Sequence, residues 1–242
     1  MPETTKTKLL IAPCSYKAAK YAVMNWHYSR CMNCGKSQYY GAWENEKFIG
    51  SIIFGIGAGN VTLGKQYGLE KMMMAELVRV ALGKHKNPVS KIISICINIV
   101  KKNNPNLRLL VSFADPTQKH LGTIYQALNW IYVGQTSKSK TYIGYDGKQY
   151  HERVISKSRI KKHYGKYTPC LSPDDCKTIR INEGKYKYLF PLDRTMRKKI
   201  EPLAKPYPKR PVGETVSRLA IQLEVSGSNP TTGLKEVSNE SP

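Results

Sequence analysis

The sequence predicts an α/β fold in which a mixed central sheet is flanked by helices. Between residues 75 and 134, segments with strand character alternate with segments of helical periodicity. Two of the strand segments, AELVRVAL and LRLLVSFA, are predominantly apolar, as strands at the centre of a sheet are. A polar turn at 44–46 separates two further strand-like runs and predicts a hairpin.

Local patterns predict the elements of the N-terminal part. A helix is expected to begin near Ser15, because the apolar and aromatic residues of KAAKYAVMNWHYS share a face. The expected elements here are a strand at 8–11, this helix, a loop at 31–37, and strands at 38–45 and 47–59.

An irregular, glycine-bearing stretch at 60–74 leads into the middle of the chain. The helix expected over 89–102 carries its apolar residues on one side. The elements expected in this part are a strand at 75–82, that helix, a strand at 107–114, a helix at 123–130, a strand at 131–136, and a hairpin at 141–155 that turns at Asp146–Gly147.

The composition indicates a polyanionic partner. Among 242 residues, 39 are Lys or Arg and 17 are Asp or Glu, which gives a formal charge of +22. Nucleic acid is the first candidate and an anionic membrane surface the second. The chain shows no basic amphipathic helix, lipidation signal, signal peptide or apolar run of about 18 residues, so a cytoplasmic protein is expected.

Charge also suggests the domain organisation. Residues 135–210 hold 20 of the basic residues and 7 of the acidic ones, and the end of the chain is rich in Pro, Gly, Ser and Thr. We therefore expect a catalytic core at 1–155, a basic extension that binds DNA at 156–210, and a disordered tail at 211–242.

The six cysteines do not form the pattern of a disulfide scaffold, so reduced thiols or a metal site remain. Cys31 and Cys34 have the spacing of half a zinc site, whereas Cys170 and Cys176 are atypically spaced partners. Cys14 and Cys96 are expected to be small buried side chains.

Several polar residues stand where strands end, which is where α/β folds place function. Asp115 follows an apolar strand and precedes Pro116, so it is a candidate base or metal ligand, or alternatively a turn former. His120 either joins it or is a surface histidine. His27 and Tyr28 close the first helix, as a general base or metal ligand with its positioning partner, or as a helix cap.

Two charged residues interrupt the apolar strand at 75–82. Glu76 and Arg79 are three positions apart, so they are expected on opposite faces. Glu76 is a second candidate catalytic carboxylate, and Arg79 is expected either to bind a donor phosphate or to form an internal salt bridge.

The order of elements at 75–134 resembles the core of the acyl-CoA N-acyltransferase (GNAT) superfamily. The resemblance implies that the loop LGKHKNPVS holds the donor's pyrophosphate, although only Gly83 of the usual glycine pattern is present and Lys84, His85 and Lys86 supply charge. It also implies a tyrosine near the thiol leaving group, here Tyr125, or one that only packs. Ser112 is assigned to the same cofactor site.

Four ordered motifs, HYS at 27–29, AELVR at 75–79, SFADP at 112–116 and GTIYQALNWIYVG at 122–134, resemble the phage Mom family of DNA-modification proteins. The resemblance spans about residues 20–155. It implies a GNAT-like enzyme that converts adenine N6 of double-stranded DNA to a carbamoylmethyl derivative and shields phage DNA from host restriction in the bacterial cytoplasm. The implied cofactors are an acyl-CoA, such as acetyl-CoA, and iron held by His27 and Asp115.

The implied product constrains the chemistry. A carbamoylmethyl group is joined to N6 through its CH2 carbon, whereas transfer of an acetyl group would join it through the carbonyl carbon. Ordinary acyl transfer therefore does not make this product directly. Either the donor differs from acetyl-CoA or a redox metal takes part.

The basic extension carries the expected DNA contacts. Side chains expected to neutralise phosphates are Lys157, Arg159, Lys161, Lys162 and Lys166, and tyrosines expected to stack on an unpaired base are Tyr164, Tyr167, Tyr186 and Tyr188. The alternative is a solvated basic face. Two other functions stay open: an acetyltransferase acting on a protein or RNA amine, and a non-catalytic nucleic-acid-binding protein.

Overall fold

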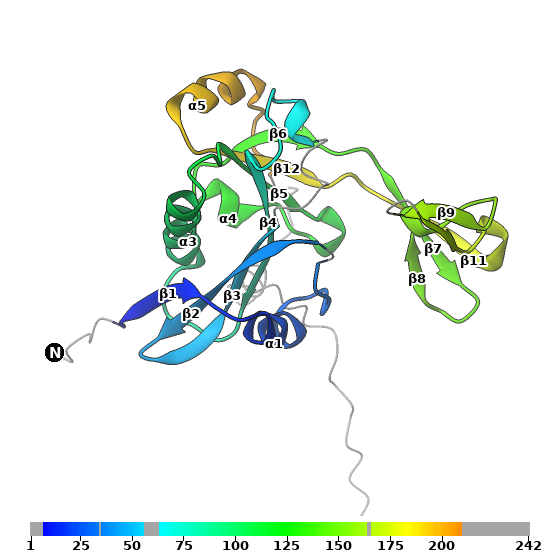
Figure 1. Ribbon diagram of the computed structural model, residues 1–242, viewed down its shortest axis with the longest axis horizontal. Coiled ribbons are helices and arrows are strands. Elements are labelled where there is room, and N and C mark those ends of the chain that lie inside the picture. The colour runs from blue at the N-terminus through cyan, green and yellow to red at the C-terminus, as the bar shows by residue number, and fades with distance from the viewer. Residues whose placement is uncertain (1–6, 34, 56–62, 164–165, 210–242) are drawn as a thin grey trace, which may run out of the picture.

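A seven-stranded mixed sheet forms the centre of the molecule (Figure 1). The computed structural model describes residues 7–33, 35–55, 63–163 and 166–209. In sheet order the strands are β1 (Leu9–Pro13), β2 (Ser37–Glu44), β3 (Lys47–Gly55), β4 (Met74–Leu82), β5 (Leu109–Ala114), β12 (Tyr186–Pro191) and β6 (Ile131–Gln135). Only β4 and β5 pair in parallel among these neighbours. The predicted fold class is confirmed.

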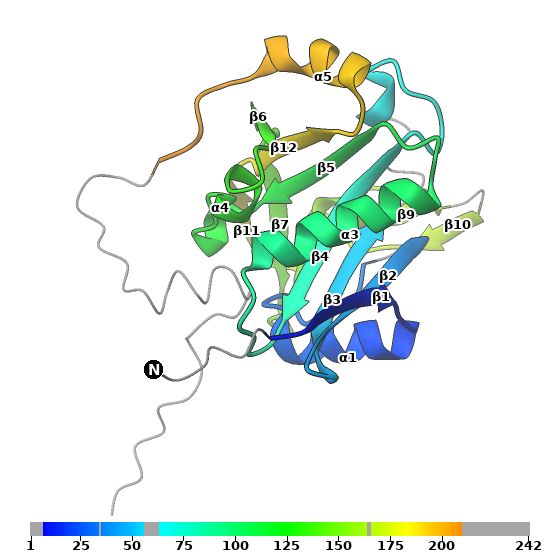
Figure 2. The same ribbon diagram turned by 90° about the vertical axis from the view of Figure 1, so that its left-hand side faces the viewer.

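Helices cover both faces of the sheet (Figure 2). The helices α3 (Val89–Asn103) and α4 (Thr123–Gln126) pack on one face, and α1 (Tyr16–Trp26) and α5 (Arg194–Ile200) pack on the other. Among the described residues, no helix combines the length and apolar character needed to cross a membrane.

Local signals mark the helix ends. Ser15 accepts a hydrogen bond from the backbone N–H of Ala18 and caps α1, as its position in the sequence predicts. The helix expected over 123–130 ends earlier, at Gln126, and Asn129 adopts a positive φ of 55°. This left-handed conformation turns the chain directly into β6.

Strand β12 lies in the sheet although the sequence places it in the basic extension. It pairs with β5 on one side and β6 on the other, and Tyr188 and Leu189 are fully buried. The prediction that Tyr188 stacks on a nucleobase is wrong, because the residue is buried in the core. The segment YKYLFP alternates aromatic and other residues and stands in a basic region, so its local sequence is also compatible with an exposed surface. Only the pairing with strands on both sides places it in the core.

Residues 137–185, here called the arm, project to one side of the central sheet (Figure 1). The arm contains a three-stranded sheet of β11 (Cys176–Asn182), β7 (Ser139–Gly144) and β8 (Gln149–His151), and a two-stranded sheet of β9 (Ile160–His163) and β10 (Lys166–Pro169).

Short 3-10 turns lie within the arm at Glu152–Val154 and Pro173–Asp175, and outside it at Pro116–Gln118 and Glu201–Leu203.

The arm starts and ends at one point of the sheet. The backbone N–H of Thr136 donates to the carbonyl of Lys185 (2.9 Å), and the N–H of Lys185 donates to the Thr136 hydroxyl (2.9 Å). The predicted hairpin at Asp146–Gly147 is present as β7 and β8, but it belongs to the arm and not to the core sheet. The tail expected over 211–242 lies outside the described residues.

Candidate active site

A cleft opens where β4 and β5 separate. The parallel pairing runs only from Met74–Leu109 to Glu76–Val111. At the next position the carbonyl of Leu77 accepts the hydroxyl of Ser112 (2.7 Å). Beyond this point Val78 and Val80 of β4, and Phe113 and Ala114 of β5, line the cleft.

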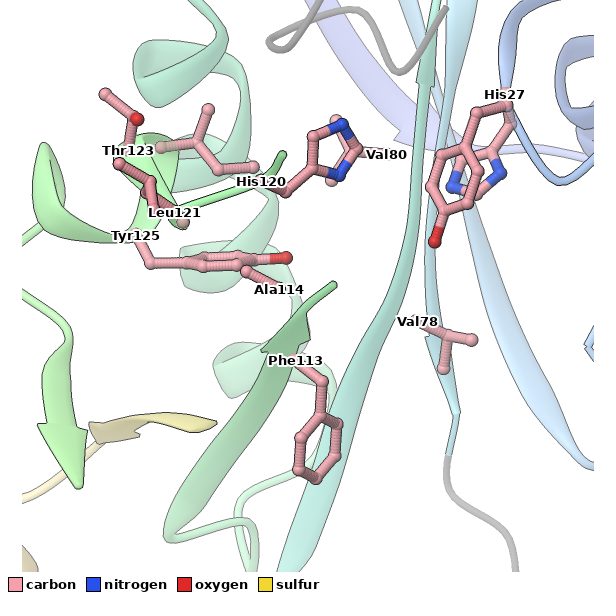
Figure 3. A pocket seen from close by; sticks show the side chains of 12 residues that line it. His27, Val78, Val80, Phe113, Ala114, His120, Leu121, Thr123 and Tyr125 are labelled. Carbon is pink, nitrogen blue, oxygen red and sulfur yellow. The ribbon is translucent and has the colours of Figure 1, made fainter. Parts of the chain in front are cut away.

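Two other segments complete the lining (Figure 3). His27 and Tyr28 come from the residues after α1, and residues 120–125 come from the turn before α4 and from α4 itself. The view shows His27 on one side of β4 and His120 and Tyr125 on the other. Because all of them line the same cleft, the structure brings together His27, Tyr28 and Tyr125, which belong to distant motifs of the sequence.

The opposite orientation predicted for Glu76 and Arg79 is wrong. Strand β4 carries a bulge at Val78, because Leu77 pairs with Phe54 and Arg79 pairs with Ile53 on β3. The extra residue shifts the alternation of side chains, so Glu76 and Arg79 lie on the same face, the one covered by α1. Spacing along a regular strand does not reveal such a bulge.

Arg79 fastens the segment after α1 to β4. Its Nε donates to the carbonyl of Cys31 (3.3 Å) and its Nη1 donates to the carbonyl of Val78 (2.9 Å). Both contacts are to backbone carbonyls and neither is the internal salt bridge that the sequence suggested; the donor phosphate, the other suggested partner of Arg79, stays a prediction. The guanidinium thereby holds a positive charge near His27 and Tyr28.

His27 is a neutral imidazole with a defined tautomer. It follows the last residue of α1, is 7% exposed, and its Nδ1 accepts the backbone N–H of Ser29 (3.1 Å). Because Nδ1 is an acceptor, the ring proton resides on Nε2. Burial, followed by the charges of Arg79 and His120, lowers the pKa of His27 to about 3.

Aromatic rings form one wall of the cleft. Tyr28 lies against the His27 ring with 4.4 Å between centroids, and it meets the His120 ring edge-on at 5.4 Å. Burial raises the pKa of Tyr28, and the charge of Asp115 adds to this while Arg79 opposes it. Burial lowers the pKa of His120 although Asp115 opposes the shift. Both histidines of the cleft are therefore uncharged at neutral pH.

Tyr125 directs its proton away from the cleft. Its hydroxyl lies 2.7 Å from the Ser112 hydroxyl. Ser112 has a single proton, and the carbonyl of Leu77 can only accept, so Ser112 donates to Leu77 and Tyr125 donates to Ser112. Burial raises the pKa of Tyr125 to about 12, against the opposing hydrogen bond with Ser112. Ser112 thus supports Tyr125 from behind and is itself buried.

Asp115 is occupied by structural contacts. Its Oδ1 accepts the backbone N–H of Thr117 (3.0 Å) and the Thr117 hydroxyl (2.6 Å), which caps the turn at Pro116–Gln118. Its Oδ2 lies 3.5 Å from Nζ of Lys185. Asp115 acts on the cleft through its charge, since it shifts the pKa of both Tyr28 and His120.

The iron site expected at His27 and Asp115 does not fit the donor set. Ser29 engages Nδ1 of His27, and Thr117 and Lys185 engage the carboxylate of Asp115. Within the described ranges, no three His, Cys, Asp or Glu side chains gather as a metal site would require. The zinc alternative depends on Cys34, which lies outside those ranges.

The loop between β4 and α3 holds the predicted cofactor residues Gly83, Lys84 and Lys86, but an internal carboxylate binds its amides. Glu44, at the end of β2, accepts the backbone N–H groups of Lys86 (2.8 Å) and Asn87 (2.6 Å). No local pattern indicates this contact, since residue 44 is expected only as part of a polar turn. The acyl-CoA expectation therefore has no open cradle at these amides.

The predicted DNA-binding residues lie in the arm. Lys157 is exposed, whereas Arg159 is paired with Asp175 at 2.7 Å. Lys161 and Lys162 belong to β9 and Lys166 to β10, while Tyr164 lies outside the described residues. The arm also presents Tyr167, which is 72% exposed.

Comparison with known proteins identifies the family. The family model of the Mom protein family matches residues 8–209. This chain belongs to the Mom family. The resemblance drawn from its four motifs is confirmed, and the match extends beyond them through β12 and α5.

This Mom family chain is similar to individual proteins in sequence and in structure. It is 26% identical over 198 residues to the protein named methylcarbamoylase mom of Escherichia phage Mu, a match that covers 79% of this chain and 80% of the relative. Similar solved structures include FeeM, an N-acyl amino acid synthase from uncultured soil microbes (TM-score 0.46, 11% identity, 81% of this chain and 96% of that chain). A Bacillus subtilis acetyltransferase in complex with CoA is also similar (TM-score 0.43, 11% identity, 78% and 100%).

Proposed function

We propose that this chain is a DNA-modifying transferase that places a carbamoylmethyl group on adenine N6 and protects phage DNA from restriction in the host cytoplasm. The observation that carries the proposal is the family match over residues 8–209, which includes every segment that lines the cleft. The name of the phage Mu relative, a methylcarbamoylase, supports the same chemistry.

The cleft suits a planar base removed from the DNA stack. N6 is difficult to reach inside a duplex, so the target adenine is expected to flip out. The rings of Tyr28, Phe113 and His120 supply flat surfaces on which a base can stack. Because both histidines of the cleft are uncharged, this environment is favourable for a neutral base.

Two side chains are proposed to act on the reacting groups. Tyr125 donates its own proton to Ser112, so its oxygen is available to accept a hydrogen from the N6 amine and to orient it. His27 carries its proton on Nε2 and would donate a hydrogen bond through it, without losing the proton, to negative charge that develops during transfer. Arg79 and Asp115 are proposed to act through their charges, which shift the pKa of Tyr28 in opposite directions, and Glu76 stays a candidate catalytic carboxylate.

Nucleoside analysis tests the function directly. The full chain is expressed in bacteria, and the cellular DNA is digested and analysed by mass spectrometry. We expect a modified deoxyadenosine whose added mass is that of a carbamoylmethyl group. An acetyl mass would indicate ordinary acyl transfer, and an unmodified adenosine pool in the presence of folded protein would refute the proposal.

The arm is proposed to hold the DNA backbone. We expect Lys157→Ala combined with Lys161→Ala and Lys162→Ala to weaken duplex binding and to reduce the slope of log K against log salt by about 0.9 for each phosphate that these lysines neutralise. Fluorescence anisotropy at several salt concentrations measures both quantities.

A control variant removes the same charge elsewhere. Lys20, Lys47 and Lys102 are exposed residues of α1, β3 and α3, and their triple alanine variant should retain the slope of the unmodified chain. If both triple variants lose the same affinity and slope, the charge of the whole molecule binds DNA and the arm has no special role.

A further inference from the structure

The loop at residues 83–88, between β4 and α3, has two adjacent backbone amides already bound to an internal anion. The carboxylate of Glu44 accepts the backbone N–H of Lys86 at Oε2, and at Oε1 it accepts the backbone N–H and the side-chain Nδ2 of Asn87 (2.8 Å for the latter). Two adjacent amides and one side-chain amide thus converge on a single internal anion.

Neither end of the loop, Gly83 or Pro88, offers a free backbone N–H group. The N–H of Gly83 donates to the carbonyl of Ile49 (2.8 Å), and Pro88 has no N–H. A side chain at Gly83 would approach the Trp26 ring to 2.7 Å, so the glycine makes room for this indole. In this chain Gly83 therefore serves packing by Trp26 and not the close approach of a phosphate.

Electrostatics reinforce the geometry. The positive end of the α3 dipole favours an anion at this position, and Glu44, which is 8% exposed, supplies it. Burial would raise the pKa of Glu44, but the hydrogen bonds from Asn87 and Lys86 and the nearby His85 lower it below its usual range. The carboxylate is ionised at neutral pH and would repel a diphosphate brought to the same amides.

We propose that Glu44 is a built-in anion that takes the place of a bound diphosphate, so that the group donor reaches the β4–β5 cleft without a diphosphate anchor at this loop. The inference concerns the donor of the proposed DNA modification and rests on that function. The inference indicates a class of donor that the protein recognises through the part that enters the cleft. A nucleotide attached to this donor would contribute little to its binding.

A comparison of two ligands tests the proposal on the protein without any substitution, here called the unmodified chain. CoA and pantetheine share the thiol arm, and only CoA carries the diphosphate with the adenosine 3′-phosphate joined to it. Isothermal titration at about 0.3 M NaCl, where screening suppresses non-specific attraction to a basic protein, measures both affinities. We expect the two to differ by less than about threefold, since a tenfold preference would already require about 1.4 kcal/mol from the nucleotide portion of CoA, which includes the diphosphate. A preference for CoA of tenfold or more overturns the proposal.

Variants of Glu44 test the anion site itself. Glu44→Ala leaves the amides of Lys86 and Asn87 without their acceptor, so inorganic pyrophosphate should raise the Tm of this variant by about 2 °C or more beyond its effect on the unmodified chain. Glu46→Ala, which removes the same charge from an exposed residue of the adjacent turn, should behave like the unmodified chain.

Each outcome separates this proposal from the proposed function. Equal pyrophosphate shifts in all three proteins would show that Glu44 does not fill an anion site. If Glu44→Ala does not fold, Glu44→Gln in the same assay and the CoA comparison still decide the matter. A strong preference for CoA together with a carbamoylmethyl mark on DNA would overturn the inference on the donor and leave the DNA modification intact.

Discussion

Replacement of His27 by alanine is expected to lower DNA modification by about 10²-fold or more, the usual effect of removing a hydrogen-bond donor from developing charge. The tautomer follows from the N–H of Ser29 on Nδ1, which leaves the proton on Nε2. Quantification of modified nucleoside after a fixed reaction time measures the effect.

The pH dependence of the same reaction carries a second part of this prediction. The pKa of His27 is about 3 because burial and the charges of Arg79 and His120 disfavour the cation. Protonation therefore occurs only as the pH falls toward 3, and no loss of activity from His27 is expected between pH 5 and 8. An activity that falls with a pKa near 6.5, and does so only when His27 is present, would contradict the neutral donor.

Two conservative variants distinguish the roles of the two ring nitrogens of His27. The side chain of His27→Gln can place a donor near the position of Nε2, whereas the side chain of His27→Asn can restore the acceptor for Ser29 but not that donor. We expect the glutamine variant to retain more activity than the asparagine variant. The reverse order would assign the role of His27 to the Ser29 contact and to loop structure.

Deletion of residues 186–209 is expected to prevent the core from folding. Strand β12 pairs with both β5 and β6, so its loss exposes two strand edges. The deletion also removes the fully buried side chains of Tyr188, Leu189 and Ile200 and the almost fully buried Met196. At about 1.5–3 kcal/mol for each, this burial is comparable with the entire stability of about 5–15 kcal/mol of a typical domain. Circular dichroism and thermal unfolding report the outcome.

Removal of the arm is the matched control. Thr136 and Lys185 are already hydrogen-bonded, so an Asn-Gly turn in place of residues 137–184 can join β6 to β12 as a hairpin. We expect this protein to fold with a cooperative transition and to bind DNA weakly. A folded protein after deletion of 186–209 would show that β12 is dispensable, and an unfolded protein after removal of the arm would show that the arm is part of the core.

Much of the candidate site was accessible from the sequence because it depends on residue type and local order. His27 and Tyr28 follow a helix with a clear beginning at Ser15, and Tyr125 follows the apolar strand that forms β5. Each local pattern predicts an element, and the family motifs place these elements in one enzyme. The structure brings the three side chains to a single cleft, and their roles in the reaction stay predictions.

Other features depended on contacts that no local pattern encodes. The bulge at Val78 reverses the expected relation of Glu76 and Arg79, and a bulge arises from pairing with β3 rather than from the sequence of β4. Asp115 caps the turn through Thr117, which is the turn-forming alternative that the sequence offered, but its ion pair with Lys185 depends on the chain that leads into β12.

By itself, the sequence determined the fold class, the order of the core elements, the basic character and the family, because these follow from periodicity, composition and ordered motifs. Only the tertiary structure decided that β12 enters the core, that β4 and β5 part to form a cleft, and that Glu44 occupies the loop before α3. All three join segments that lie far apart in the chain. Such contacts depend on which edges and amides remain available once the chain has folded, and that is a property of the whole molecule.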